Sequence, residues 1–167
     1  MKNYYRAKPG RYCDFHGVNY YSRSTVSGLR DGARRNCAKN DLGWEIYPQG
    51  LIQCARKLLK ICSLPIYITE NGVCDNKDAF RCRFIYDQLR AIASSGLPIE
   101  RYYHWSFLDN FEWLDGMSAR FGLVEVDPET GKRTVKKSGK FYSEIIKRGG
   151  IDEELFEEYV ADEVYHQ

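Results

Sequence analysis

The chain has 167 residues, which is enough for one domain with its own hydrophobic core. Its 25 Lys and Arg residues nearly balance its 23 Asp and Glu residues, and the formal net charge is +2. This balance argues against a dedicated nucleic-acid-binding protein, which would carry a concentrated basic face. No apolar stretch approaches the roughly 20 residues of a membrane span, so we expect neither nucleic acid nor membrane as a partner.

The N-terminal segment, residues 1–11, is polar and basic, and we expect it to be a flexible end without a signal peptide. Residues 13–21 predict a strand because they are rich in aromatic and β-branched side chains. Residues 22–43 are rich in Ser, Gly, Arg and Asn and predict a solvated surface loop. An alternative is that its arginines bind an anionic substrate; they are Arg23, Arg30, Arg34 and Arg35.

An apolar stripe with a period of 3.6 predicts a helix over about residues 50–63, which Pro65 ends. A strand follows over Ile66–Thr69, and a second stripe predicts a helix over about 78–95. Gly96 and Pro98 come after this helix in the order typical of a helix end. A third strand is predicted at about 101–107.

The rest of the chain alternates loops with short elements. We expect a loop over 108–121, a strand over 121–126 with a turn after it, and helices over 138–147 and 152–159. Residues 160–167 are predicted to be a flexible end, and the whole of 1–167 to be one domain.

The six cysteines lack the paired spacing typical of a zinc site, so the sequence predicts no metal and no cofactor. Cys54 and Cys62 fall on the apolar face of a predicted helix, where cysteine acts as a small apolar residue. Together with the absence of a signal peptide, this predicts a soluble, reduced, cytoplasmic protein.

Strand, helix, strand, helix, strand is the order of a parallel α/β sheet. In such folds, functional side chains lie at the carboxyl ends of the strands. Asn19, Glu70 and Trp105 all fall at or near those ends, which is a reason to group them that does not depend on any motif.

Three segments carry a specific signature: Asp14-Phe15-His16-Gly17-Val18-Asn19-Tyr20-Tyr21, Tyr67-Ile68-Thr69-Glu70-Asn71-Gly72 and Trp105-Ser106-Phe107-Leu108-Asp109-Asn110-Phe111-Glu112-Trp113. In this order they resemble the sugar-binding half of retaining β-glycosidases of glycoside hydrolase family 1. The stretches Asp41–Leu51 and Arg120–Leu123 are also similar to segments of that family. The resemblance runs from about residue 8 to 150.

The resemblance implies an α/β fold that is a partial (β/α)8 TIM barrel. The segments look like strands six to eight of the barrel with their helices, in a single C-terminal half-barrel domain. Because a complete barrel needs roughly 250 residues, three such strands do not close one, and their outer edges are expected to be unpaired.

The resemblance also implies roles at the site of a β-glucosidase that hydrolyses O-glycosyl bonds with retention. Glu70 matches the catalytic nucleophile, because a carboxylate can attack the anomeric carbon and hold the sugar as an ester. Tyr21 matches the residue whose hydroxyl orients that carboxylate. Asn19 matches a residue near the sugar subsite.

Four further residues match the subsite for the nonreducing-end sugar: Trp105, Glu112, Trp113 and Phe121. Trp105 offers a stacking face, and Glu112 can accept hydrogen bonds from two adjacent hydroxyls. Because Glu112 would repel a phosphate dianion, the substrate is expected to be an unphosphorylated β-glucoside or a related sugar. Phe121 could equally be a core residue.

The acid/base of this family lies in a Thr-x-Asn-Glu-Pro motif, and Asn-Glu-Pro does not occur in this sequence. His16 and His104 do not substitute for it, and we expect structural roles for both. The chain is therefore expected to be truncated, and to be one part of a split enzyme whose partner is a complementary N-terminal half. The alternatives are a sugar-binding remnant without catalysis and a self-associating half-barrel.

Overall fold

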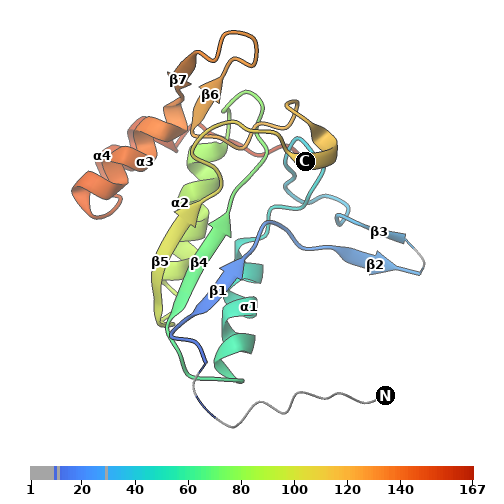
Figure 1. The fold of residues 1–167 in the computed structure, drawn as a ribbon, viewed down its shortest axis with the longest axis vertical. Helices are drawn as coiled ribbons and strands as arrows, with labels where there is room; N and C mark the ends of the chain where they lie inside the picture. Colours follow the sequence, from blue (N-terminus) through green and yellow to red (C-terminus); the bar gives the residue numbers. More distant parts are fainter. Residues whose placement is uncertain (1–9, 11, 29) are drawn as a thin grey trace.

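The computed structural model describes residue 10, residues 12–28 and residues 30–167, with the backbone alone for residues 27, 30 and 31. The expected flexible segment 1–11 therefore lies almost entirely outside the described residues. The centre of the fold is a three-stranded parallel sheet of β1 (His16–Asn19), β4 (Ile66–Asn71) and β5 (Ile99–His104), in the order β1-β4-β5 (Figure 1). These are the three strands that the sequence predicts, with shorter bounds at β1 and an earlier start at β5.

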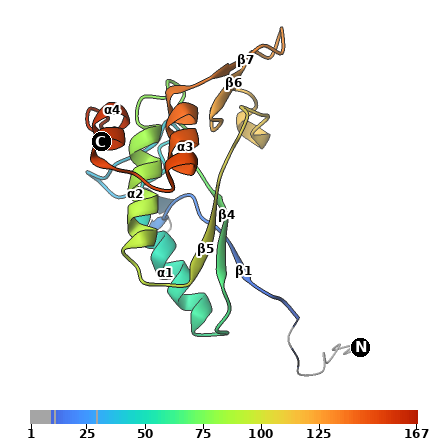
Figure 2. The same cartoon turned by 90° about the vertical axis from the view of Figure 1, so that its left-hand side faces the viewer.

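Two helices connect the strands and pack on one face of this sheet: α1 (Pro48–Leu59) and α2 (Arg81–Ala93). Pro48 suits the first turn of α1, where a backbone N–H has no helical partner. The stripe predicted from the sequence faces the sheet, since Leu51 and Ala55 are fully buried against Ile66 and Ile68. Figure 2 shows the helices on one side of the strands and no element on the other side.

The uncovered side of the sheet is here called the open face. The strand register places Gly17, Tyr67 and Arg101 side by side in one row of it. Val18, Ile68 and Tyr102 form the next row and belong to the apolar cluster on the helical side. This alternation follows from the two-residue period of a strand.

The C-terminal part adds a hairpin and two helices beyond β5. The hairpin consists of β6 (Val124–Val126) and β7 (Arg133–Val135), and the helices are α3 (Lys137–Arg148) and α4 (Glu153–Tyr159). A second core cluster joins α2 to these helices through Phe84, Phe141 and Leu155, all fully buried. The sequence predicts β6 and both helices, but not β7.

Residues 22–43, which the sequence predicts to be a loop, contain a hairpin of β2 (Thr25–Ser27) and β3 (Arg30–Gly32). The prediction was wrong here because three-residue strands are too short to show an alternating pattern. Figure 1 shows the hairpin projecting away from the central sheet.

The end of the chain, expected to be flexible, has a defined place in the structure. Val160 is fully buried, and the Tyr165 hydroxyl donates a 2.9 Å hydrogen bond to Asp87 on α2. The buried Glu163 accepts hydrogen bonds from Arg83 and Lys137. These contacts attach the last residues to the outer side of α2.

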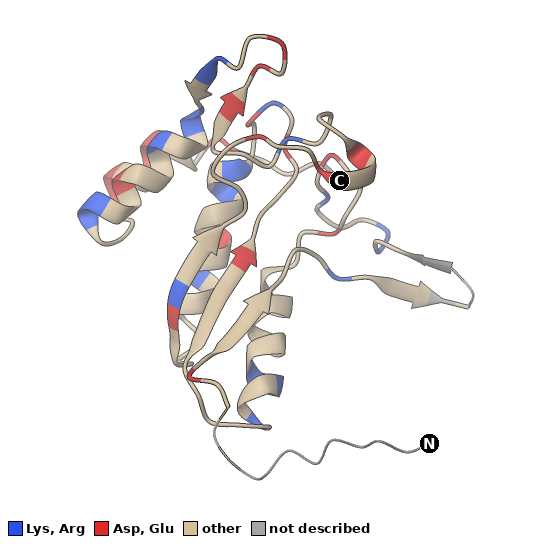
Figure 3. Ribbon diagram, viewed as in Figure 1, with Lys and Arg blue, Asp and Glu red and all other residues tan. Residues whose placement is uncertain are grey.

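Charged side chains are unevenly distributed over these elements. Figure 3 shows them concentrated on α3 and α4, whereas β1 and most of β4 carry none. Within the part of the chain that the structure describes, no helix is long and apolar enough to cross a membrane.

Candidate active site

The carboxylate of Glu70 lies near the end of β4, between the two neighbouring strands. The Tyr21 hydroxyl, just beyond β1, donates a 2.7 Å hydrogen bond to Glu70 Oε2. No hydrogen bond from a described residue engages Oε1. One carboxylate oxygen is thus held in place and the other is available to a ligand.

The Tyr21 phenol is a hydrogen-bond donor at any physiological pH. Burial, the hydrogen bond to Glu70 and the negative charges of Glu70 and Glu112 together raise its pKa well above the ordinary value. The ring of Tyr21 also contacts Phe121 edge to face, with the ring centroids 6.2 Å apart. The hydroxyl is therefore fixed from both ends of the side chain.

Asn71 joins the nucleophile strand to both of its neighbours. Its amide nitrogen donates to the Tyr20 carbonyl oxygen at 2.7 Å, and its amide oxygen accepts from the Tyr102 hydroxyl at 2.8 Å. The side chain is fully buried, so these bonds satisfy polar groups that would be costly to leave unpaired. The sequence did not single out Asn71 for this role.

Gly72 explains why a glycine ends this motif. A Cβ atom at position 72 would lie 1.8 Å from the Trp105 carbonyl oxygen, closer than any real contact. The Trp105 backbone N–H also donates to the Asn71 carbonyl oxygen at 2.9 Å. The end of β4 and the segment after β5 therefore meet backbone to backbone.

Trp105 and Glu112 lie together at the same end of the sheet. The indole Nε1 of Trp105 donates a 3.0 Å hydrogen bond to Glu112 Oε1. Trp105 packs against a small cluster that contains the buried residues Phe121 and Cys74. The Trp105–Ser106 peptide bond is cis.

Two of the predicted site residues lie apart from this group. Trp113 begins a short 3₁₀ helix, its side chain is 83% exposed, and its indole makes no hydrogen bond with a described residue. Asn19 accepts a 2.6 Å hydrogen bond from Thr69, one residue before Glu70. Phe121, predicted as either a site or a core residue, is buried in the cluster beside Trp105.

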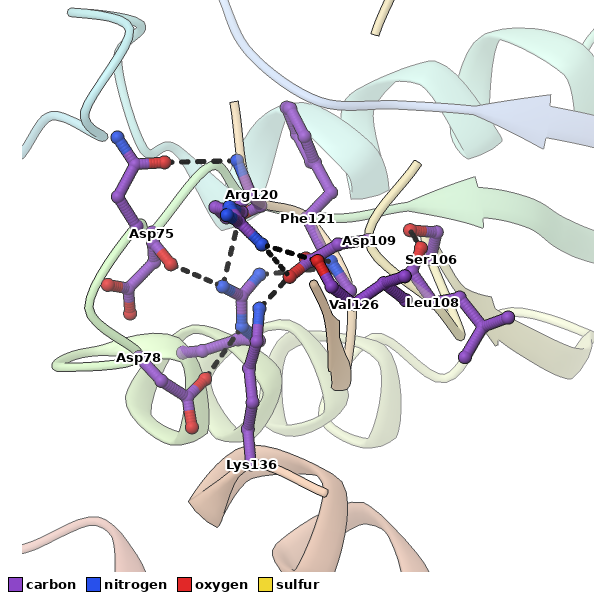
Figure 4. A network of polar contacts seen from close by, with 12 residues as sticks. Asp75, Asp78, Ser106, Leu108, Asp109, Arg120, Phe121, Val126 and Lys136 are labelled. Atoms are coloured by element: carbon purple, nitrogen blue, oxygen red, sulfur yellow. Dashed lines mark hydrogen bonds and ion pairs between the residues drawn. The ribbon is translucent and has the colours of Figure 1, made fainter. Parts of the chain in front are cut away.

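A polar network fixes the loops around the site (Figure 4). Asp109, with a side chain that is 1% exposed, pairs with Arg120 at 3.1 Å and Lys136 at 2.8 Å. It also accepts a hydrogen bond from the Gly122 backbone N–H at 2.9 Å. This confirms the prediction that Asp109 braces a loop by bonding to the backbone.

Arg81 is a second centre of this network, and the sequence gave no sign of it. Its fully buried guanidinium donates to the carbonyl oxygens of Val73, Asp75 and Phe121 at 2.7, 2.5 and 2.9 Å. It also pairs with Asp78 at 2.8 Å. Arg81 thereby ties the loop after Glu70 to the strand segment that carries Phe121.

The arginines of segment 22–43 were considered as ligands for an anion. Arg23 is instead paired with the buried Glu45 through two guanidinium nitrogens, and its guanidinium lies 3.6 Å from the centre of the Tyr47 ring. The side chain of Arg30 is outside the described residues. Arg34 and Arg35 are exposed.

Both histidines considered in the sequence lie away from the Glu70 carboxylate. His16 Nε2 lies 2.9 Å from the Cys62 carbonyl oxygen. The ring nitrogens of His104 are buried, and burial lowers its pKa to about 3, so the ring is neutral. Among the described residues, no group of three or more His, Cys, Asp and Glu side chains is arranged to hold a metal ion.

The family model of glycosyl hydrolase family 1 matches residues 3–151. This chain belongs to glycosyl hydrolase family 1. The match covers all three strands of the sheet and every predicted site residue.

Relatives within family 1 agree with this assignment. The chain is 36% identical over 159 residues to beta-glucosidase A of Thermotoga maritima, covering 84% of this chain and 36% of that protein. It is 37% identical over 162 residues to a beta-galactosidase of Sulfolobus acidocaldarius, covering 85% and 33%. The chain thus spans about a third of the length of the curated relatives it matches.

Solved family 1 structures share the fold. The beta-glucosidase from Pyrococcus furiosus superposes with a TM-score of 0.77 at 37% identity, covering 85% of this chain and 34% of that one. The Thermotoga maritima beta-glucosidase in complex with noeuromycin gives a TM-score of 0.74 at 35% identity, covering 83% and 36%. These neighbours are TIM-barrel enzymes, of which this α/β chain corresponds to a part.

Proposed function

We propose that this chain carries the nucleophile of a retaining β-glycosidase that acts on β-glucosides, and that Glu70 is that nucleophile. The hydrogen bond between Tyr21 and Glu70 is the observation that carries the proposal. It places a carboxylate with one free oxygen at the carboxyl ends of parallel strands, where α/β enzymes have their sites. The family membership and the beta-glucosidase relatives support the same chemistry.

In this proposal β1, β4 and β5 are the sixth, seventh and eighth strands of a family 1 barrel. Glu70 Oε1 attacks the anomeric carbon, and the bond from that carbon to the leaving oxygen breaks. The leaving oxygen keeps the electron pair and takes a proton from a second carboxylic acid. Water then attacks the same carbon, gives its proton to the second carboxylate and frees Glu70, so the β configuration is retained.

The remaining predicted residues form the sugar subsite. Trp105 supplies a stacking face, and Glu112 accepts hydrogen bonds from adjacent hydroxyls through Oε2, since Oε1 is bonded to Trp105. Phe121 supports the Trp105 side of the subsite, and Asn19 lies beside Thr69 below Glu70. The exposed Trp113 indole offers a donor at the rim.

The second carboxylic acid has no candidate in the Asn-Glu-Pro form within this sequence. We therefore propose that it comes from outside these residues, in a complementary part of a family 1 barrel. A sugar-binding protein without turnover is the second candidate function. The missing motif favours it, because binding needs the subsite but not the acid.

The test is intact-mass measurement after incubation with a 2-fluoro-glucoside that carries a good leaving group. This reagent needs a nucleophile but little help from an acid, so the isolated chain can be examined. We expect a mass increase located at Glu70, and none in Glu70→Gln. Folded protein without any label would overturn the nucleophile proposal, and sugar-dependent quenching of Trp105 fluorescence in the same sample would favour the binding function.

A further inference from the structure

The open face of the sheet carries an aromatic patch. The rings of Phe15 and Tyr67 stack with their centroids 4.2 Å apart and their planes 16° apart. Tyr103 follows Arg101 on the neighbouring strand, and it is 48% exposed, while Phe15 is 42% exposed. Apolar side chains of this size on a sheet surface are typical of a face that another layer covers.

Arg101 lies in the middle of this patch. Its guanidinium is 5.2 Å from the centre of the Tyr67 ring, and it makes no ion pair with a described residue. Other arginines around the site are paired: Arg23 with Glu45, Arg81 with Asp78 and Arg120 with Asp109. Arg101 is thus a cation on an aromatic surface without a carboxylate.

Both edges of the sheet are also unpaired within the described residues. β1 pairs with β4 alone, and β5 pairs with β4 alone, so the outer backbone groups of β1 and β5 can accept further strands. Parallel strands are normally buried on both faces. Here, α1 and α2 bury one face and leave the other.

We propose that the open face binds a second polypeptide segment that adds parallel strands at these edges and places a carboxylate against Arg101. The segment has the chemistry of the part of family 1 enzymes that this chain does not match, so the inference rests on the proposed function. That part makes up about two thirds of the relatives, since the chain covers 36% of Thermotoga maritima beta-glucosidase A.

Charge disfavours a second copy of this chain as the occupant. A second copy would bring another Arg101 and the same two edges. The carboxylate of Glu70, at the end of β4, is already bonded to Tyr21. A segment with its own acidic side chain is the complementary surface.

The experiment mixes the full chain with the part of Thermotoga maritima beta-glucosidase A outside the matched segment, and measures mass and affinity by native mass spectrometry and sedimentation. We expect a one-to-one complex, weakened at least tenfold by Arg101→Glu and retained in Arg101→Lys. Arg56→Glu, an exposed charge reversal on α1, is the matched control and should leave the affinity unchanged. Homodimers only, no complex, or an unchanged affinity in Arg101→Glu would overturn the inference.

Labelling by the 2-fluoro-glucoside separates this inference from the proposed function. A complex that forms with the expected Arg101 dependence but takes no label would retain the interface and reject the nucleophile. Label on the chain without any complex would retain the nucleophile and reject the interface.

Discussion

The hydroxyl of Tyr21 and the carboxylate of Glu70 are joined by a 2.7 Å hydrogen bond between the segment after β1 and the end of β4. A positioned donor of this kind restricts the carboxylate to one orientation and leaves Oε1 free. The bond therefore converts the parallel pairing of two strands into the placement of one reactive oxygen.

Tyr21→Phe removes this donor and keeps the ring. We expect the rate of Glu70 labelling by the 2-fluoro-glucoside to fall about 10- to 100-fold, because a misplaced nucleophile reacts slowly. Tyr20→Phe is the matched control, since the Tyr20 hydroxyl donates to the Tyr47 carbonyl oxygen and not to Glu70. Equal labelling rates in the wild type and Tyr21→Phe would contradict an orienting role.

Glu112→Gln tests the sugar subsite. The charged acceptor is replaced by an amide of the same size, and a hydrogen bond to a charged group contributes about 1.5–3 kcal/mol. The glucoside concentration for half-maximal labelling should rise about 10-fold or more. Asp115→Asn, on the neighbouring 3₁₀ helix, serves as the control. A smaller change in Glu112→Gln than in the control would remove Glu112 from the subsite.

Asp109→Asn should destabilise the chain by about 3 kcal/mol, because Arg120 and Lys136 would lose their buried counter-charge. Urea unfolding followed by circular dichroism measures the loss. Glu144→Gln removes an exposed carboxylate that pairs with Lys147, and it should change the free energy of unfolding by less than about 1 kcal/mol. Similar losses in both variants would mean that the Asp109 network does not hold the loops.

Gly72→Ala tests the close approach of β4 to the segment after β5. The added Cβ would overlap the Trp105 carbonyl oxygen, so the backbones must separate, and we expect a loss of about 2 kcal/mol or more and slower labelling of Glu70. Gly150→Ala is the control, because a Cβ there meets no atom within 4 Å. A Gly72→Ala variant as stable as Gly150→Ala would rule out the close contact.

The sequence predicted the elements with strong local signals and missed those without them. The helices α1 and α2 follow from 3.6-residue stripes with Pro65, Gly96 and Pro98 at their ends. The short strands of β2, β3 and β7 have three residues each and no such pattern. Their pairing depends on turns and neighbours that a local pattern does not encode.

The site shows the same division. Glu70, Tyr21, Trp105 and Glu112 belong to motifs, and the structure brings them together in two hydrogen-bonded pairs. Arg81 was missed because most of its acceptors are backbone carbonyl oxygens in separate segments, and any sequence supplies such groups. The position of Trp113, exposed at the rim, could not be predicted from its motif, since it depends on the path of the loop.

The buried ring of His104 makes stability depend on pH. Its pKa of about 3 in the folded chain lies below the ordinary value of 6.5, so the unfolded chain binds the proton first as the pH falls. Stability from the neutral ring is therefore present above about pH 6.5 and is lost progressively down to about pH 3. Between about pH 7.5 and pH 4.5 this group alone should lower the free energy of unfolding by about 3 kcal/mol.

His104→Phe isolates this contribution, because phenylalanine keeps an aromatic ring beside Tyr142 and does not titrate. Urea unfolding of both proteins at the two pH values gives four free energies, and the carboxylates shared by both proteins cancel in the comparison. The decrease from about pH 7.5 to about pH 4.5 should be about 3 kcal/mol smaller in the variant. An equal decrease in both proteins would mean that His104 takes up its proton as readily in the folded chain as in the unfolded one, which a buried ring without compensating partners does not do.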